Sequence, residues 1–291
     1  MKIETIVYAE WLYNHLIRLD QPTGSGDGLQ VIQVGDKDAE AYRMGHIPGA
    51  IYLDTNTFER APAWNVLPID QLAQALLAHG IHSEKRIVLC GKDRLAVART
   101  ALVLMYAGVR ELRIFWGGIE AWLASGYQLE SGTNPPKPVN AFGRKLPAHP
   151  EYIVDMQQVR GLVTDRKGIL ACVRTWDEFV GKLSGYDYIQ PKGRIPGSVW
   201  AALPGNEAYR AQHSQTPAST ARLYQEIAAS WRDRGLTPDK KVVFYCGTGW
   251  RASEAFLYAR WLGWKDICIY DGGWLEWSAQ ADNPIEVGEP G

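Results

Sequence analysis

An internal repeat constrains the possible folds of this chain more than any other feature of its sequence. Shifting the chain by 155 residues superposes, without a gap, Ile87-Val88 on Val242-Val243, Gly108 on Gly263, Gly117-Gly118 on Gly272-Gly273 and Trp122 on Trp277. At a slightly different offset, residues 45–50 and 193–198 share the pattern Gly-His/Arg-Ile-Pro-Gly-Ala/Ser. Matching blocks in the same order predict two copies of one structural unit in tandem.

Length and composition fit two soluble domains. A chain of 291 residues is long for one domain and comfortable for two. Hydrophobic residues make up 46% and charged residues 22%, so each half can bury a core. Residues 131–150 hold five prolines and few apolar side chains, which is typical of a stiff linker. We therefore expect domain one at 1–130, a linker at 131–150 and domain two at 151–291.

Apolar runs alternate with helical patterns in both halves. The expected strands are 31–34, 87–90, 112–115, 168–173, 241–246 and 267–270, and the expected helices are 72–79, 97–105, 220–234, 254–262 and one that begins at Trp176. Residues 199–219, with Pro204, Gly205 and Pro217, are expected to form a surface loop. Strands that alternate with helices predict an α/β fold, with a central parallel sheet and helices on both faces in each domain.

The segment 241–253 predicts a reactive cysteine. A run of β-branched and aromatic residues, typical of a buried strand, ends at Cys246, and helical spacing begins at Glu254. A thiol at such a turn lies at the positive end of a helix, where the helix dipole and the loop amides favour the thiolate. Gly247 and Gly249 allow those amides to converge on one atom, and Arg251 adds a permanent positive charge. An isolated cysteine is more often a small core residue, but these neighbours favour reactivity.

The same residues carry a family resemblance. Residues 246–251, Cys-Gly-Thr-Gly-Trp-Arg, resemble the six-residue active-site loop of the rhodanese family, in which a cysteine carries sulfane sulfur as a persulfide. The Gly-x-Ile-Pro-Gly blocks and the Asp-Gly-Gly-Trp segment at 271–274 resemble two further signatures of that family. The resemblance covers nearly the whole chain. It implies two tandem rhodanese-like domains, no cofactor, and a thiosulfate sulfurtransferase that passes sulfur to a thiophilic acceptor.

The resemblance also implies roles for single residues. Arg251 is the candidate for holding the sulfonate end of the donor, because a guanidinium matches paired oxygens. Arg194 matches a position at which thiosulfate-using members place a substrate-contacting arginine, and a surface charge is the alternative. Thr248 either offers a hydroxyl to the persulfide or caps the helix, and Trp250 either walls the sulfur or packs against domain one. The expected catalytic residue is Cys246, and the expected substrate-binding residues are Arg251, Arg194, Gly247, Thr248, Gly249 and Trp250.

Domain one carries its own cysteine in a different register. Under the gapless alignment Cys90 falls on Tyr245, and Gly91 takes the place of Cys246. Asp93 would also put a carboxylate where an anionic sulfur needs to be. Domain one is therefore expected to be non-catalytic, although a one-residue gap would restore Cys90.

The other cysteines predict no metal or disulfide. The four cysteines are far apart and form no Cys-x-x-Cys pair, so neither a disulfide framework nor a zinc site is expected. Cys172 is expected to be an inert core residue, and Arg174 is expected to form a structural ion pair with Glu178 at helical spacing.

Three other functions remain to be compared. A related phosphatase class resembles Cys-x5-Arg, but only four residues separate Cys246 from Arg251, which disfavours that class. Loops of 3-mercaptopyruvate sulfurtransferases tend to end in Gly-Val-Thr or Gly-Val-Ser, whereas Trp250-Arg251 stands here. A persulfide carrier or sensor with little turnover of its own is the third reading.

Charge and hydropathy limit the partners. A net charge of −1 and a pI near 6.6 argue against nucleic acid and acidic membranes. No apolar run approaches the roughly 20 residues of a membrane span. The expected partners are a small anionic sulfur donor and a thiol, cyanide or protein acceptor. A cytoplasmic location is expected, or a periplasmic one if a signal peptide has been removed.

Overall fold

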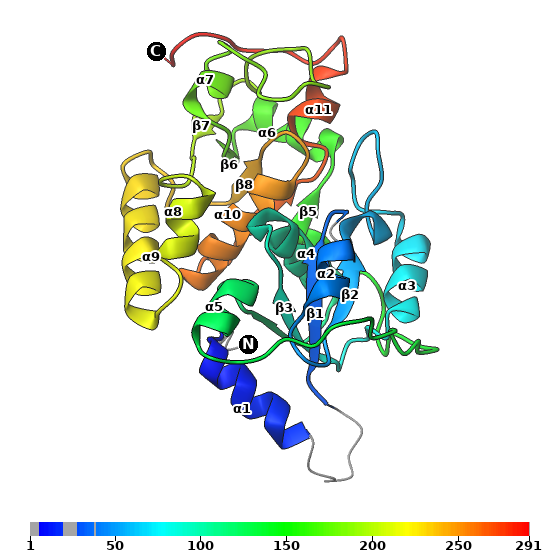
Figure 1. Ribbon diagram of the computed structural model, residues 1–291. Coiled ribbons are helices and arrows are strands. Elements are labelled where there is room, and N and C mark those ends of the chain that lie inside the picture. The colour runs from blue at the N-terminus through cyan, green and yellow to red at the C-terminus, as the bar shows by residue number, and fades with distance from the viewer. Residues whose placement is uncertain (1–5, 20–27, 38, 291) are drawn as a thin grey trace. The chain divides into compact units, whose positions relative to one another are not determined.

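The structure is a computed structural model that describes residues 6–19, 28–37 and 39–290. It divides into two compact units (Figure 1). The first unit comprises Met1–Glu59, Val66–His149 and Glu207–Ala221, and the second comprises Arg60–Asn65, Pro150–Asn206 and Arg222–Gly291. The two units are described separately below.

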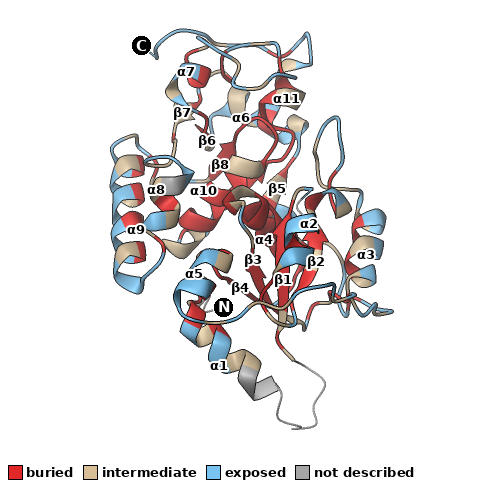
Figure 2. Cartoon of the chain, in the orientation of Figure 1, coloured by how far each residue is buried: buried red, intermediate tan, exposed pale blue. Residues whose placement is uncertain are grey.

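The first unit is built on a four-stranded parallel sheet in the order β2-β1-β3-β4. Its strands are β1 (Gln30–Gly35), β2 (Ile51–Asp54), β3 (Arg86–Cys90) and β4 (Glu111–Ile114). Its helices are α1 (Ala9–Leu19), α2 (Ala39–Met44), η1 (Thr55–Thr57), α3 (Ile69–Ala78), α4 (Arg94–Ala107), α5 (Gly118–Ala124) and α8 (Glu207–Gln212). Helix α4 is buried on all sides from Ala96 to Met105, which explains why most residues there are apolar (Figure 2). The two polar exceptions, Arg99 and Thr100, donate hydrogen bonds to Glu59 and to the carbonyl of Ala96.

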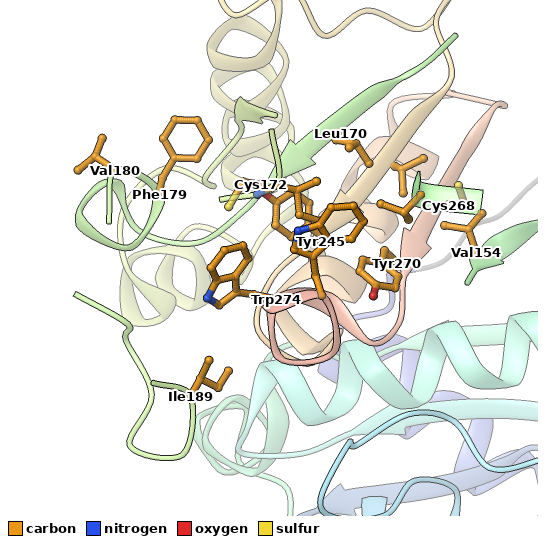
Figure 3. Close-up of a cluster of buried hydrophobic side chains, with 14 residues drawn as sticks. Val154, Leu170, Cys172, Phe179, Val180, Ile189, Tyr245, Cys268, Tyr270 and Trp274 are labelled. Atoms are coloured by element: carbon orange, nitrogen blue, oxygen red, sulfur yellow. The ribbon is translucent and has the colours of Figure 1, made fainter. Parts of the chain in front are cut away.

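The second unit contains a five-stranded parallel sheet in the order β5-β9-β8-β6-β7. Its strands are β5 (Ile153–Val154), β6 (Ile169–Cys172), β7 (Val199–Trp200), β8 (Val242–Tyr245) and β9 (Ile267–Tyr270). Its helices are η2 (Pro150–Tyr152), α6 (Met156–Asp165), α7 (Trp176–Phe179), most of α9 (Pro217–Arg232), α10 (Trp250–Trp261) and α11 (Gly273–Ser278). Side chains from β5, β6, β8 and β9 meet those of Phe179 and Trp274 in one core cluster (Figure 3).

The repeat that the sequence shows is also a repeat of backbone geometry. Gly118 and Gly273 begin equivalent helices, with φ of 54° and 55°, a left-handed conformation that favours glycine. Gly108 and Gly263, which follow α4 and α10, have φ of 109° and 84°. The expected fold class, two α/β units with parallel sheets, is therefore confirmed.

The expectation of a surface loop at 199–219 is wrong. Residues 199–200 form β7, which pairs with β6, and α8 and the start of α9 follow. The ring of Trp200 packs edge-on against Trp176, and its Nε1 donates to the carbonyl of Arg174 at 2.8 Å. A two-residue strand and a six-residue helix are too short to show a period, and the prolines and glycine around them resemble a loop.

The proline-rich segment 131–150 is mostly exposed but is hydrogen-bonded to the first unit at several points. The amide of Val139 donates to Leu77 at 3.0 Å, and the amide of Ser83 donates to Phe142 at 2.8 Å. Residues up to His149 accordingly belong to the first unit. Within residues 6–19, 28–37 and 39–290, no helix is long and apolar enough to cross a bilayer.

Candidate active site

Cys246 lies at the carboxyl end of a central strand. Strand β8 ends at Tyr245, and α10 begins at Trp250, so the connecting turn consists of residues 246–249. Gly249 is the N-cap residue of α10 and has a φ of 86°, which only glycine adopts readily. Cys246 is 1% exposed. The sequence is thus folded as expected here: a thiol follows a buried strand and precedes the positive end of a helix.

The turn before α11 holds the loop in shape. The amide of Trp274 donates to the carbonyl of Cys246 at 2.7 Å, and the amide of Leu275 donates to the carbonyl of Gly247 at 3.0 Å. A Cβ on Gly273 would lie 2.6 Å from the carbonyl oxygen of Gly247. The Asp-Gly-Gly-Trp segment therefore brings the backbone of α11 against the Cys246 loop.

Arg251 is held by a buried carboxylate. Its two terminal nitrogens bind the two carboxylate oxygens of Glu178 at 2.9 and 2.8 Å. Burial of Glu178 raises its pKa, but the hydrogen bonds and charge of Arg251 outweigh burial, so the pKa lies below its ordinary value. The expected pair of Glu178 with Arg174 is wrong, because the carboxylate turns to Arg251 and to the backbone and hydroxyl of Thr175.

Two tyrosines complete the loop's surroundings, and sequence reasoning missed both. The hydroxyl oxygen of Tyr186 accepts a hydrogen bond from the amide of Gly247 at 3.1 Å and another from Arg251. The side chain of Tyr188 is hydrogen-bonded to Thr248. Burial, aided by the nearby Cys246, raises the pKa of Tyr186. The only signal was Tyr186-Asp187-Tyr188 within a polar, non-periodic stretch.

The other loop residues lie at the start of α10 or beside the two tyrosines. Gly249, rather than Thr248, caps α10, and the hydroxyl of Thr248 has Tyr188 as a partner. Trp250 is the first residue of α10 and is half-buried. A Cβ on Gly247 would lie 2.3 Å from the Tyr186 hydroxyl, so the glycine is required for this approach.

The structure does not bring Arg194 to the loop. Its guanidinium donates to the carbonyl of Gly288 at 2.6 Å, approaches Glu286 at 3.2 Å and lies over the ring of Phe179. It is 2% exposed, so the surface-charge alternative is wrong. In this arrangement Arg194 ties the residues near 286–288 to the Gly-Arg-Ile-Pro-Gly turn.

A buried polar cluster supports the loop from the sheet. Arg174 is fully buried; it donates to the carbonyl of Gly193 at 2.6 Å and lies 3.4 Å from the sulfur of Cys172. The hydroxyl of Tyr245 donates to Ser198 at 2.8 Å, which fastens the Gly-Arg-Ile-Pro-Gly-Ser block to β8. Cys172 and Tyr245 lie together in the core of Figure 3.

The equivalent turn in the first unit keeps the gapless register. Cys90 is the last residue of β3, as Tyr245 is of β8. In the sheets, Cys90 lies opposite Gln33 of β1, and Tyr245 lies opposite Cys172 of β6. Cys90 is 1% exposed, and burial raises the pKa of its thiol to about 12. Gly91 follows, where a Cβ would lie 2.4 Å from the carbonyl of Val34.

Comparisons with known proteins agree with this geometry. The family model for the rhodanese-like domain matches residues 19–125 and 156–280. "Thiosulfate sulfurtransferase YnjE" of Escherichia coli (strain K12) is 41% identical over 291 residues, which is 99% of this chain and 66% of YnjE. The chain therefore spans slightly less than two thirds of that relative. A 3-mercaptopyruvate sulfurtransferase of the same organism is 27% identical, over 98% of this chain and 99% of its own.

A solved structure shows the same fold. The anaerobic ergothioneine biosynthesis enzyme from Chlorobium limicola, in complex with its natural substrate trimethyl histidine, has a TM-score of 0.87 and is 36% identical. The match covers 98% of this chain and 70% of that one. With the family model matching both halves, the chain belongs to the rhodanese-like family, as a member with two such domains in tandem.

Proposed function

We propose that this protein is a sulfurtransferase that takes sulfane sulfur from thiosulfate as a Cys246 persulfide and passes it to a thiophilic acceptor. The observation that carries the proposal is the Cys246 turn, which places a thiol between a buried strand and the positive end of α10. The carbonyls of Cys246 and Gly247 accept hydrogen bonds from amides of α11. The thiosulfate sulfurtransferase named above, 41% identical, supports the choice of donor.

The proposed reaction has two displacements. The Cys246 thiolate attacks the outer sulfur of thiosulfate, the S–S bond of the donor breaks, and sulfite leaves with its electron pair. The acceptor nucleophile then attacks the terminal sulfur of the persulfide, and the Cys246 thiolate is restored. Such covalent, ping-pong catalysis suits a loop that can stabilise an anion in both forms.

We assign roles to the residues around the sulfur. The amides of Thr248 and Gly249 and the positive end of α10 stabilise the persulfide anion, as an oxyanion hole stabilises an alkoxide. Tyr186 accepts from both Gly247 and Arg251, so its own O–H can be donated toward the sulfur or the leaving sulfite. Arg251, with its fork bound to Glu178, acts as a positioning residue that holds Tyr186 and adds positive charge. Thr248 and Trp250 border the donor, and Arg194 fixes the turn at residues 193–197.

Domain one is proposed to be non-catalytic. In support of this, Cys90 is a buried strand residue whose pKa is raised to about 12, and Gly91 stands in the place of the nucleophile. The expected domain limits of 1–130 and 151–291 stay predictions. A cytoplasmic location also stays a prediction; it suits a reaction that depends on a reduced thiol.

Two alternatives share the persulfide and differ in its partners. In the first, 3-mercaptopyruvate is the donor, which the second relative supports. In the second, the protein is a carrier whose persulfide forms but requires a protein acceptor. The acceptor classes to be compared are cyanide, a small thiol, a protein thiol, and the trimethyl histidine used by the structural neighbour.

Intact mass spectrometry tests the proposal. The reduced protein is measured before and after exposure to thiosulfate, beside the Cys246→Ser variant. We expect a gain of one sulfur atom in the parent protein and none in the variant. A gain only with 3-mercaptopyruvate would move the proposal to that donor, and no gain with either donor would refute a catalytic loop.

A further inference from the structure

The turn after β3 in the first unit borders a cavity that the sulfur-transfer reaction does not use. The cavity has a volume of about 320 Å³, at the lower end of the range for small-molecule sites. Val34 and Gly91 line it at the carboxyl ends of β1 and β3, where parallel sheets collect their ligands. The turn at 116–120 and Ala211 complete its walls, and all of these residues belong to the first unit.

Positive charge prevails on the walls. Lys92 is exposed at the cavity, and Arg94 is 4% exposed with its guanidinium 3.9 Å from the centre of the Trp116 ring. Glu120 supplies the one carboxylate among the described residues that line the cavity. Asp93 is engaged elsewhere, since its carboxylate caps α4 by accepting from Leu95 and Ala96. The exposed ammonium of Lys92 is the cation to which a negatively charged ligand would bind.

Gln33 adds a second, independent indication of a ligand. This residue lines the cavity and is 7% exposed, and its Oε1 has no hydrogen-bond partner within the described part of the chain. A buried amide oxygen without a partner is costly, so such oxygens are normally paired. An N–H or O–H group of a ligand would pair this one. Val34, Ile119 and Trp116 supply apolar wall beside it.

The cavity is placed where the reactive centre would be if this unit were catalytic. Gly91 takes the position of Cys246, and the thiol of Cys90 points back to the sheet, 3.7 Å from the carbonyl of Ile32. No cysteine is among the described lining residues, so a ligand here meets no thiol. We propose that this cavity binds, without covalent chemistry, a small organic carboxylate that has an apolar body and a hydroxyl or amino donor beside the carboxylate.

Calorimetric titration of the full-length protein tests the proposal with a matched pair of probes. The probes are 3-phenyllactate, which carries the carboxylate, the ring and a hydroxyl donor, and 3-phenylpropionate, which lacks only the hydroxyl. We expect 3-phenyllactate to bind and 3-phenylpropionate to bind about tenfold more weakly, because the amide of Gln33 is then left unpaired.

Three variants assign the binding to this cavity. Lys92→Gln removes the exposed charge, Gln33→Leu removes the amide, and Lys145→Gln removes another exposed lysine, which lies outside the cavity. We expect Lys92→Gln and Gln33→Leu to weaken the binding of 3-phenyllactate about tenfold, and Lys145→Gln to leave its affinity unchanged. Sulfur transfer from thiosulfate stays at the parent rate in all three.

Two results would overturn the proposal: no binding of either probe at millimolar concentration, or equal affinity in the parent protein and in Lys92→Gln. Equal affinities of the two probes would contradict the donor requirement. If Gln33→Leu fails to fold, Lys92→Gln and the probe pair decide the question, because Lys92 is an exposed residue.

Discussion

The hydroxyl of Tyr186 connects the Arg251–Glu178 ion pair to the backbone of the Cys246 loop. Its oxygen accepts hydrogen bonds from the amide of Gly247 and from the guanidinium of Arg251, which is itself bound to Glu178. The chain of contacts runs from a buried carboxylate to the backbone that surrounds the sulfur. A substitution along it should therefore change turnover without removing the nucleophile.

Tyr186→Phe should lower the rate of sulfur transfer by about ten- to a hundredfold, because it removes one polar group from the anion-stabilising loop. Persulfide formation from thiosulfate should slow while the Cys246 thiol remains. Stopped-flow measurement of the first displacement checks this. Tyr188→Phe is the matched control, since Tyr188 is 55% exposed and its side chain is hydrogen-bonded to Thr248. An equal loss in both variants would contradict a special role for Tyr186.

Glu178 predicts a pH dependence of stability. Its pKa in the folded protein lies below its ordinary value near 4.5, so the pair with Arg251 contributes stability that is fully present above that value. The contribution is lost as the pH falls through the lower, folded-state pKa. Glu178→Gln should cost about 3 kcal/mol at neutral pH, because it leaves Arg251 without its carboxylate.

Denaturant unfolding at several pH values measures this difference. The gap between the parent protein and Glu178→Gln should be constant from about pH 6 to pH 8 and should shrink below about pH 4.5. A gap that stays constant to pH 3 would show that Glu178 does not carry this charge.

At this scale the sequence predicted the place of Cys246 and its glycines in a strand-to-helix turn and missed the side chains around them. The sequence pattern identifies Cys246, Gly247 and Gly249 because a strand, a turn and a helix follow one another within one short segment. Glu178 and Tyr186 lie more than fifty residues upstream in short or irregular structure, and only the folded sheet order brings them to the loop. The spacing rule that paired Glu178 with Arg174 describes isolated helices, whereas in the folded chain the half-buried Arg251 of α10 binds the carboxylate.

At the scale of the elements, the repeat is visible where α5 and α11 begin. Gly118 and Gly273 share φ values of 54° and 55°. Their surroundings differ: an added Cβ would lie 3.2 Å from the carbonyl of Gly91 in the first unit, but 2.6 Å from that of Gly247 in the second. The same substitution at the two positions therefore separates structure from catalysis.

Gly273→Ala should displace the catalytic loop and lower sulfur transfer more than tenfold, since about 1 Å of misplacement can cost a hundredfold in rate. Both Gly118→Ala and Gly273→Ala should lose about 1 kcal/mol or more of stability, because alanine is strained at positive φ. Thermal unfolding and steady-state kinetics measure both effects. A large loss of activity in Gly118→Ala would show that the first unit contributes directly to the reaction.

Fully buried elements were predictable even where they are short, whereas β7 and α8 were not. Strands β1, β3, β8 and β9 and helices α4 and α10 show continuous apolar runs or good helix formers, because neighbours cover them on both sides. A helix that begins at Trp176 was expected, and α7 begins there with a Thr175–Glu178 capping box. Strand β7 and helix α8 have only two and six residues, and their stability comes from packing. Tertiary contacts of this kind leave no period in the sequence.

Across the whole molecule, the two copies of the fold differ at the strand end that precedes the Cys246 turn in the second unit and the Gly91 turn in the first. One copy ends β8 at Tyr245 and places Cys246 in the turn, whereas the other ends β3 at Cys90 and places Gly91 there. Moving a thiol by one residue along a strand reverses the side on which it points. The displaced thiol of Cys90 is then buried in the core, where desolvation raises its pKa to about 12.

This divergence predicts that the chain has one functional thiol. Cys246→Ser should abolish both persulfide formation and sulfur transfer, and Cys90→Ser should keep most of the activity, because a thiol with a pKa of about 12 is almost entirely protonated near neutral pH. Cys90→Ser buries a hydroxyl in place of a thiol, so its folding is checked by circular dichroism before its rate is compared. If both variants lost activity equally while both remained folded, the two turns would have to act together, and the assignment of catalysis to the second domain would fail.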